Sequence, residues 1–383
     1  MTAPTATARL RRLDLRDFRN LEHVELTPPA EGVAVIGENG QGKTNLLESI
    51  YYLQILRSAR GARDQDLVRF GQGAFHIAAD VETDHVHEIG VGFERAGKRK
   101  RVRIDGDIPA RLSDALGALP SVLFSPADVE LVSGSPNARR RYLDIMLALT
   151  TRGYLYALQQ YRAALMRRNA ALRAAQRSAR PSRENAASIA AWEPPLAEHG
   201  AMIWRARATW VESIERAFEV LCAEIGESSQ VRIRYSSSPT LAADPVNALR
   251  SALEEKRAHD LKRGLTHVGP HRDDLTLTLD GRELRSFGSA GQQRSAAIAL
   301  RMLEVATFKE RTGRTPLFLL DDPFAELDLR RSSRILDMLT TGENRGDQQI
   351  ILAVPREHDI PRELTGLERL SMTAGHVSRM SDA

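Results

Sequence analysis

Residues 37–44 read GENGQGKT, and they follow the short apolar run VAVI at residues 33–36. Leucine, isoleucine and tyrosine then recur at helical spacing over residues 45–56. A buried strand, a glycine-rich turn and a helix, in this order, are the setting of a phosphate-binding loop. Backbone N–H groups between Gly37 and Gly42 can surround a phosphate, and the helix dipole adds to the attraction. The stretch therefore predicts an α/β fold that binds a nucleotide.

The side chains at the end of the loop predict the cofactor and its metal. Lys43 would neutralise β- and γ-phosphate oxygens, and the Thr44 hydroxyl would be a ligand of Mg²⁺. We therefore expect ATP, or a close relative of it, together with Mg²⁺. The predicted cofactor-binding residues of the loop are Gly37, Glu38, Asn39, Gly40, Gln41, Gly42, Lys43 and Thr44.

A second stretch, LFLLDDPFAELD at residues 317–328, places two carboxylates at the end of an apolar strand. Beside a phosphate loop, Asp321 would hold Mg²⁺ through water, and Asp322 would polarise the attacking water. Asp322 and Lys43 are therefore the predicted catalytic residues, and Thr44 and Asp321 the predicted metal-binding residues. The alternative, an ordinary acidic turn after a strand, is disfavoured because a phosphate loop needs such a carboxylate partner.

A third stretch, SAGQQR at residues 289–294, opens a helix that we expect over residues 289–309. Ser289, Gly291 and Gln292 at its start predict another anion site, made by helix N–H groups and the serine hydroxyl. The chain already has one phosphate loop. A second phosphate site on a separate helix makes sense if it meets the γ-phosphate held by another copy of the chain.

The composition changes between these motifs. Residues 139–183 hold eleven arginines and one acidic residue, Asp144, so the segment has a formal charge of +10 in a chain with a net charge of +4. A basic segment on an acidic body indicates a polyanion such as nucleic acid, and a solvated helix face is the alternative. The residues that we expect at DNA phosphates are Arg139, Arg140, Arg141, Arg167 and Arg168, with Arg99 and Arg101 beside a predicted hairpin.

Apolar side chains predict a helical hairpin in the same region. A heptad-like stripe runs from Tyr154 to Leu172 and is interrupted by Arg168, and a second helix begins near Leu196 after a break at residues 178–191. Each helix would span about 25 residues, or roughly 38 Å. Strands are expected near residues 13–18, 24–26, 33–36, 76–81, 86–93, 231–235, 275–279, 317–320 and 349–354.

Several classes of protein and site are excluded or disfavoured. No apolar run of about 18 residues occurs, so we expect no membrane span, and residues 1–15 lack the apolar core of a signal peptide. Cys222 is the single cysteine, so no intramolecular disulfide can form, and a buried, inert thiol is expected. Residues 271–274, HRDD, have no second histidine or cysteine at ligand spacing, so a turn with internal ion pairs is favoured over a metal site. We expect a cytoplasmic protein.

The order of these motifs resembles the ATP-binding-cassette superfamily and, within it, the RecF family of bacterial recombination-repair ATPases. The resemblance covers almost the whole chain. It rests on DFRN at 17–20, GENGQGKTNLLE at 37–48, SPADVELVSGSP at 125–136, RRRYLD at 139–144, QYRAALMRRNAAL at 160–172, VGPHRDDL at 268–275, SAGQQR at 289–294 and LLDDPFAELD at 319–328.

This resemblance implies an ABC-type P-loop ATPase head of two lobes, residues 1–135 and 266–383, with an inserted, mainly helical arm domain at 136–265. It implies an ATP-dependent DNA-binding protein of recombinational repair and replication restart. Such a protein forms a homodimer on ATP, binds single-stranded DNA and gapped or linear duplexes, hydrolyses ATP slowly, and supports RecA loading and the SOS response with RecO and RecR. Ser289 would then reach the nucleotide of the second subunit.

The chain departs from other cassette ATPases at three places. Residues 124–128, FSPAD, contain no glutamine where other members place one near the γ-phosphate. Val354 and Pro355 stand where a switch histidine often follows the last strand, and His358 comes later, so a surface histidine is favoured over a switch. Asp322 is shorter than the usual glutamate. We therefore expect a weak ATPase that works as a timed switch.

Three rival functions are disfavoured. A structural chromosome ATPase of the SMC type would need hundreds of residues of coiled coil. The nucleotide-binding subunit of a transporter would carry the glutamine and the switch histidine and would not need a basic arm. An ATPase–nuclease would need a further acidic, metal-dependent domain.

Overall fold

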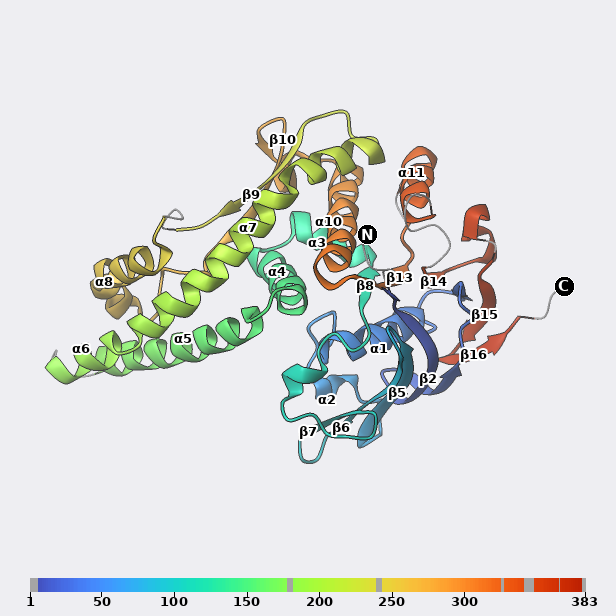
Figure 1. The fold of residues 1–383 in the computed structure, drawn as a ribbon, viewed down its shortest axis with the longest axis horizontal. Helices are drawn as coiled ribbons and strands as arrows, with labels where there is room; N and C mark the ends of the chain where they lie inside the picture. The colour runs from blue at the N-terminus through green and yellow to red at the C-terminus, as the bar shows by residue number, and fades with distance from the viewer. Residues whose placement is uncertain are drawn as a thin grey trace. The chain divides into compact units, whose positions relative to one another are not determined.

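The computed structural model describes residues 6–177, 182–238, 243–324, 327–340, 348–364 and 366–380. The chain divides into two compact units, which Figure 1 shows as ribbons: residues 1–128 with 298–383, here called the head unit, and residues 129–297, here called the arm unit. The predicted boundary at residues 265–266 differs from the boundary of the compact unit at 297–298. The physical reason is strand pairing, since residues 274–279 pair with residues 231–236 inside the arm unit.

A six-stranded sheet forms the centre of the head unit, in the order β16-β15-β4-β14-β13-β8. Neighbours from β15 to β8 are parallel, and β16 is antiparallel to β15. Every residue of β4, β13 and β14 is buried, as expected for strands covered on both faces. The strands are β4 (Gly32–Ile36), β8 (Ser121–Phe124), β13 (Leu317–Asp321), β14 (Ile350–Val354), β15 (Glu368–Thr373) and β16 (His376–Arg379).

A five-stranded antiparallel sheet, in the order β3-β2-β5-β6-β7, is the second sheet of the head unit. Side chains along β5 alternate between buried and more exposed positions, so one face is packed and the other faces solvent. Helix α1 (Lys43–Ile55) contacts strands of both sheets, and Tyr52 packs edge-on against Phe18 and Phe75. The strands are β2 (Arg9–Phe18), β3 (Leu21–Leu26), β5 (Ala74–Glu82), β6 (Val86–Glu94) and β7 (Arg99–Ile104).

The remaining elements of the head unit are short or peripheral. Strand β1 (Ala6–Thr7) pairs in parallel with β12 (Arg314–Thr315). The helices are α2 (Asp64–Leu67), α11 (Leu329–Thr340), the C-terminal part of α10 (Ala290–Thr312), and the 3-10 turns η1 (Leu112–Ala115), η2 (Pro126–Val129), η3 (Glu357–Asp359) and η4 (Arg362–Leu364).

The predicted helical hairpin is present in the arm unit as α5 (Tyr154–Arg177) and α7 (Glu193–Ile225), which pack together with α6 (Arg183–Ala190) between them in the chain. Helix α8 (Pro245–Arg263) was not predicted, because only four of its residues are buried and its apolar stripe is weak. The other elements are α3 (Glu130–Ser133), α4 (Pro136–Thr150), β9 (Val231–Ser236), β10 (Asp274–Leu279), β11 (Arg282–Glu283), α9 (Leu284–Phe287) and the start of α10.

Two arginines that interrupt the apolar stripes are in the core of the arm unit. Arg168 is fully buried, and it donates to Asp260 at 2.7 Å and to Glu193 at 3.1 Å. Arg207, which is 2% exposed, donates to Asp144 at 2.7 Å. Buried charges are tolerated in proteins when they are paired in this way.

Two further expectations concern the chain as a whole. None of the helices in the described ranges combines the length and the apolar character that a membrane span requires. Cys222 is buried, and burial beside Glu227 raises the pKa of its thiol to about 12. The prediction of a buried cysteine is confirmed, and a raised pKa favours the protonated thiol.

Candidate functional site

Two of the predicted motifs meet at one edge of the six-stranded sheet. The phosphate loop follows β4, Asp321 ends β13, and β14 lies between these two strands. The carboxyl ends of parallel strands share one edge, and α/β sheets bind their ligands there. Thr44 and Asp321, which are 277 positions apart in the sequence, are in hydrogen-bond contact at this edge.

The contact between Thr44 and Asp321 is a hydrogen bond whose length also fits two neighbouring oxygen ligands of Mg²⁺. Oγ1 of Thr44 donates to the carboxylate and lies 3.0 Å from Oδ1 and 2.9 Å from Oδ2. Neighbouring oxygens around octahedral Mg²⁺, with bonds of 2.0–2.1 Å, lie about 2.9 Å apart. The hydroxyl and the carboxylate are therefore spaced as two adjacent ligands, or as one ligand and one partner of a bound water.

The charges at this edge are held largely out of water. Asp321 is 7% exposed and Lys43 is 8% exposed. Burial raises the pKa of Asp321, an effect that the hydrogen bond from Thr44 partly offsets. Burial also lowers the pKa of Lys43, against the attraction of Asp321 and Asp322. A desolvated ammonium beside a desolvated carboxylate is typical of functional sites.

The start of α1 leaves its N–H groups available. The residue before the helix is Gly42, whose φ is +118°, no side chain caps the helix, and its first turn holds no acidic residue. The Nζ of Lys43 donates to the carbonyls of Gly37 at 2.5 Å and Glu38 at 2.9 Å. Uncapped N–H groups and an ammonium at the same end of a helix form an anion site.

The DFRN stretch supports the loop from the turn between β2 and β3. The Asn20 amide donates to the carbonyl of Gln41 at 3.1 Å and accepts from the amide of Asn45 at 2.7 Å. Gly42 has a φ of +118°, which favours glycine, and a Cβ there would also lie 2.9 Å from the Asn20 amide. Gln41 is also held through its Oε1, which accepts from the N–H of Ala374 at 2.5 Å. The loop is thus positioned from two sides.

A cavity of about 410 Å³ opens at this edge, within the size range of ligand pockets. It includes five of the eight loop residues. Gly37, Glu38 and Gln41 instead hold the loop and Lys43 in place. The lining residues are Asn39, Gly40, Gly42, Lys43, Thr44, Asn45, Arg60, Pro126, Asp321, Asp322 and Pro355.

Arg60 is a lining residue that the sequence analysis missed. Its guanidinium donates to Asn45 Oδ1 at 2.5 Å and, through Nε, to Glu48 at 3.1 Å. Glu48 lies on α1 and is 1% exposed, so it anchors the arginine beside the loop. No local pattern marks this role, because Arg60 follows the end of α1 and meets the cavity only through the fold.

Asp322 lines the cavity in an unusual backbone conformation. Its φ is +45°, and its N–H donates to the carbonyl of Ala353 at 2.9 Å. Left-handed conformations of non-glycine residues cost energy and cluster at functional sites. The catalytic role of Asp322 stays a prediction. Ala325 and Glu326, which belong to the predicted loop after this strand, lie outside the described residues.

Besides Asp322, the other two departures from other cassette ATPases also lie at the cavity. Pro126 and Pro355 line it, and within the described ranges no glutamine or histidine does so. Asp128 is instead paired with Arg301 at 2.6 Å. The His358 side chain is 70% exposed and lies 3.6 Å from Asp359, as expected for a surface histidine.

Ser289 directly precedes helix α10, in the arm unit. Its Oγ accepts from the N–H of Gln292 at 3.3 Å, and its own N–H donates to Oε1 of Gln292 at 2.9 Å. This is a capping box. Ser289 is exposed, and its hydroxyl hydrogen can still be donated to an anion. Its predicted role at the nucleotide of a second subunit stays a prediction, as does that of Gly291.

Two of the predicted DNA contacts are corrected by burial. Arg139 is 2% exposed and donates to both oxygens of Asp274, at 2.6 and 2.8 Å. Arg168 is fully buried in the ion pairs described above. Neither guanidinium is presented to a DNA phosphate, because helix packing turned these two arginines inward to meet acids from distant parts of the chain.

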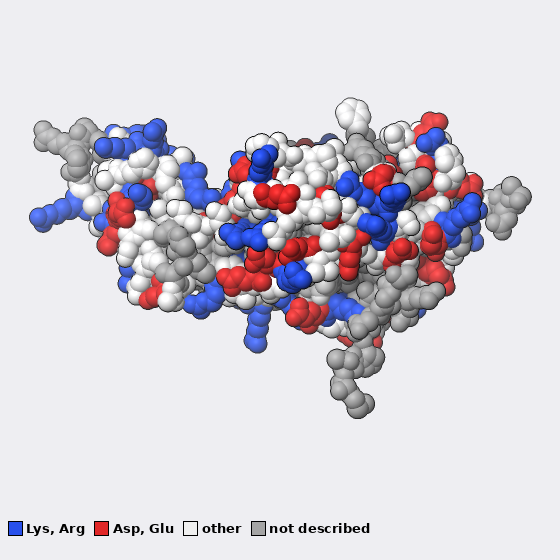
Figure 2. Space-filling view, turned by 90° about the horizontal axis from the view of Figure 1, so that it is seen from above, with Lys and Arg blue, Asp and Glu red and all other residues white. Residues whose placement is uncertain are grey.

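The other predicted DNA contacts remain accessible. Arg99, Arg101 and Arg167 are exposed, and Arg140 and Arg141 are half-buried. On the face that Figure 2 shows, Lys and Arg side chains are interspersed with Asp and Glu. That face therefore presents separate basic positions rather than one continuous basic surface.

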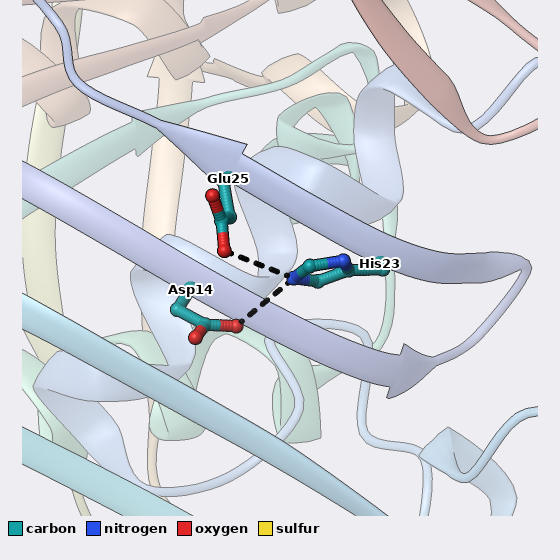
Figure 3. A group of neighbouring side chains, drawn as sticks. All are labelled: Asp14, His23 and Glu25. Atoms are coloured by element: carbon teal, nitrogen blue, oxygen red, sulfur yellow. Dashed lines mark ion pairs between the residues drawn. The ribbon is translucent and has the colours of Figure 1, made fainter.

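Two clusters that could suggest a metal have other partners. Figure 3 shows Asp14, His23 and Glu25 turned toward one another; Nε2 of His23 lies 3.4 Å from each carboxylate. Arg12 and Arg16 also pair with Asp14, so this is a surface ion network. At residues 271–274, Nδ1 of His271 meets the Tyr161 hydroxyl at 2.6 Å. The expected ion pairs within the turn are not what the described residues show, because Asp274 pairs with Arg139 on α4 and Asp273 accepts from Trp204 and Tyr235.

Comparisons with known proteins agree with this geometry. The model of the RecF/RecN/SMC N terminal domain matches residues 9–374. The DNA replication and repair protein RecF of Geobacter sp. (strain M21) is 36% identical over 92% of this chain and 94% of its own length. The protein of the same name from Frankia alni (strain DSM 45986 / CECT 9034 / ACN14a) is 36% identical over 97% of this chain and 100% of its own.

Solved structures give the same result. A structure of the recombination mediator protein RecF-ATP in the RecFOR pathway is 28% identical, with a TM-score of 0.88 and 99% of each chain covered. An Smc head domain from Pyrococcus furiosus, 17% identical with a TM-score of 0.55 over 98% of this chain and 97% of its own, shares the fold alone. The chain therefore belongs to the RecF family of DNA replication and repair proteins, with the α/β fold of an ABC-type P-loop ATPase.

Proposed function

We propose that this chain is an ATP-dependent DNA-binding protein of recombinational repair and replication restart. The observation that carries the proposal is the cavity at the uncapped start of α1, where Lys43, Thr44 and Asp321 are brought together. The RecF relative of solved structure binds ATP, and the relatives are replication and repair proteins.

Different residues of the cavity bind different parts of the nucleotide. The N–H groups of the loop and Lys43 bind phosphate oxygens, and Arg60, which is hydrogen-bonded to Asn45, supplies a second cation. Thr44 and Asp321 would hold Mg²⁺, which neutralises phosphate charge when bound. Asp322 orients the attacking water.

Slow hydrolysis fits the lining of the cavity. Pro126 and Pro355 offer neither an amide nor an imidazole to the γ-phosphate. Asp322 is the one described acid beside Asp321 in the lining, and its side chain is short. Because few groups position the attacking water, hydrolysis is slow, and the bound nucleotide persists and acts as a switch.

The switch acts through pairing of two copies. The start of α10 is exposed, and Ser289 keeps a donor available. The site of the γ-phosphate held by one copy is completed by Ser289, Gly291 and Gln292 of the other copy. ATP therefore promotes a homodimer, and hydrolysis releases it.

The paired form binds DNA. Arg99, Arg101, Arg140, Arg141 and Arg167 supply salt-sensitive contacts to phosphates, which carry no sequence information. Single-stranded DNA and gapped or linear duplexes are the substrates, and RecO and RecR are the partners, as in the pathway of the solved relative. RecA loading follows from this assembly.

The test measures binding to a gapped duplex by fluorescence anisotropy, with and without ATP. The unmodified protein should bind in ATP and lose most of its affinity without it. Lys43→Arg should keep part of the nucleotide affinity, hydrolyse more slowly and bind DNA more weakly. Equal DNA affinity with and without ATP would contradict the switch, and failure of radiolabelled ATP to bind would contradict the nucleotide site itself.

A further inference from the structure

A second cavity, of about 200 Å³, lies entirely within the arm unit and is unused by the nucleotide site. We call it the arm cavity. Three helices and the turn before β10 enclose it. Its lining residues are Asn137, Arg140, Arg141 and Asp144 from α4, Leu158, Tyr161, Arg162 and Leu165 from α5, Ile203 and Arg207 from α7, and Pro270 and His271 from the turn.

The helical spacing explains why these residues share one cavity. The four α4 residues stand at positions i, i+3, i+4 and i+7, and so do the four α5 residues. Residues at these spacings occupy one helix face. Each of these two helices thus turns a complete face toward the same space, and the lining is rigid because it belongs to packed helices.

Positive charge exceeds negative charge around the arm cavity. Four arginines line it, against the single carboxylate of Asp144. That carboxylate is shared, since Oδ1 accepts from Arg207 at 2.7 Å and Oδ2 from Arg162 at 2.9 Å. Asp273 is the next acid, and its carboxylate is bound by the Trp204 indole and the Tyr235 hydroxyl.

Burial is the main cause that lowers the pKa of Arg140; the charge of Arg207 lowers it further, whereas Asp274, Asp273 and Asp144 act in the opposite direction. An anion in the cavity would help to stabilise this partly desolvated guanidinium. His271 adds no charge to the cavity near pH 7, because burial lowers its pKa to about 4 and the ring stays neutral.

The lining of the cavity also includes apolar side chains. Leu158, Leu165, Ile203 and Pro270 lie among the arginines in it. A ligand that fills this space must therefore combine an anionic group with an apolar body of similar size. A backbone phosphate with its deoxyribose has this combination, with the phosphate at the arginines and the sugar carbons at the leucines.

We propose that the arm cavity receives one phosphate group of a nucleic-acid backbone, bound by Arg140, Arg141 and Arg162, with the attached sugar against Leu158 and Leu165. The inference rests on the proposed DNA binding and adds a recessed contact to it. Exposed arginines form loose contacts with phosphates, whereas this cavity fixes one phosphate relative to the helices and so sets the register of the DNA on the arm unit.

The test compares a variant that fills the cavity with one that removes charge. Leu165→Trp blocks the space without changing charge, and Arg162→Gln removes one cation whose side chain is 55% exposed. Arg205→Gln is the matched control, because Arg205 is exposed on α7 and does not line the cavity. Each full-length protein is titrated with gapped duplex in ATP at 50 and 200 mM salt, after circular dichroism confirms its fold.

Loss of one phosphate contact should make the affinity ratio between 50 and 200 mM salt about 3.5-fold smaller, because each contact adds about 0.9 to the logarithmic salt slope. Leu165→Trp and Arg162→Gln should both show this change, and Arg205→Gln should not. If both cavity variants have the same salt slope and affinity as the unmodified protein, the proposal is overturned. ATP-dependent binding that persists in them would leave the proposed function intact.

Two further experiments identify the source of the anion. Inorganic phosphate, with ionic strength held constant by chloride, should weaken DNA binding of the unmodified protein and leave Leu165→Trp unchanged. Phosphate binding is also measured by calorimetry. If Leu165→Trp abolishes phosphate binding while DNA binding stays equal in both proteins, the cavity serves free phosphate and not DNA. If Leu165→Trp loses affinity for polyglutamate but keeps its affinity for DNA and phosphate, the cavity serves an acidic protein segment and the proposal is wrong.

Discussion

At the nucleotide site, single residues are held in place by partners that are remote in the chain. Arg60 depends on Glu48 and Asn45 of α1, and the phosphate loop depends on Asn20 in the turn after β2. Burial, which separates Lys43 and Asp321 from water, makes their charges available to a ligand instead. Predictions at this scale therefore concern supporting residues as much as the residues that touch the nucleotide.

Arg60→Ala should weaken ATP binding about tenfold or more, because a hydrogen bond to a charged group contributes about 1.5–3 kcal/mol. Titration with a fluorescent ATP analogue measures the change. Arg57→Ala is the control, since Arg57 is exposed and does not line the cavity. Equal affinities of the two variants would remove Arg60 from the site.

His271 and Asp273 should give the arm unit opposite responses to pH. The pKa of His271 is lowered from 6.5 to about 4, mainly by burial. Its folded-state pKa lies below the unfolded value, so its contribution is complete above pH 6.5 and is lost as pH falls toward 4. The pKa of Asp273 is raised from 3.8 to about 6, again by burial. Stability from this group therefore falls as pH rises from 3.8 to 6.

His271→Gln and Asp273→Asn separate the two effects in urea unfolding between pH 4 and 7.5. The free-energy difference between the unmodified protein and His271→Gln should shrink on acidification, by about 3 kcal/mol at most. For Asp273→Asn the difference should change in the opposite sense. Tryptophan fluorescence reports the arm unit, because the three tryptophans of the chain, at 192, 204 and 210, all lie there. Slopes of the same sign would contradict the assignment.

At the scale of elements, α5 carries two neighbouring arginines with different roles. Arg168 is fully buried between Asp260 and Glu193, whereas Arg167 is exposed and its guanidinium lies 4.9 Å from the Trp192 ring. The helix face decides the difference, since adjacent residues point about 100° apart on a helix of 3.6 residues per turn.

Arg168→Ala should lower the free energy of unfolding by about 3–5 kcal/mol, because it removes the arginine from the fully buried Asp260 and leaves Glu193 paired with Arg257 alone. Arg167→Ala should lower it by about 1 kcal/mol or less, the range of an exposed cation–π contact, and should reduce the salt dependence of DNA binding. Urea unfolding of both variants tests the pair. Similar stability losses would show that the buried ion pairs do not support the helix packing.

At the scale of the whole molecule, the arm unit distinguishes this chain from its rivals. Helices α5 and α7 have 24 and 33 residues, far short of the hundreds of residues of coiled coil expected of a structural chromosome ATPase. The likeness to the Smc head domain is one of fold. The phosphate loop lies in the head unit and Ser289 in the arm unit, and in the proposed homodimer the Ser289 of one copy would complete the nucleotide site of the other.

Ser289→Arg should abolish ATP-dependent dimers while ATP binding stays within about twofold, because a long cation would occupy the space of the γ-phosphate without touching the phosphate loop of its own chain. Light scattering after size exclusion, with and without ATP, measures this. Ser286→Arg is the control, as Ser286 is exposed in α9. Persistent dimers of Ser289→Arg in ATP would exclude the shared site.

The sequence by itself determined the features made by neighbouring residues. GENGQGKT, LFLLDD and SAGQQR each combine a strand or helix end with its ligand-binding groups within a few positions, so local spacing was enough to place them. The helical hairpin was also predicted, since the apolar stripes of α5 and α7 are periodic along each helix.

Only the tertiary structure decided which arginines of the basic segment are exposed. Arg139 and Arg168 were read as surface cations because their acidic partners, Asp274, Asp260 and Glu193, are distant in sequence. Arg60 escaped notice because only the fold brings it to the lining of the cavity. Charge and spacing describe a residue's chemistry, whereas burial depends on what the rest of the chain packs against it, and that packing decides between an ion pair in the core and a contact on the surface.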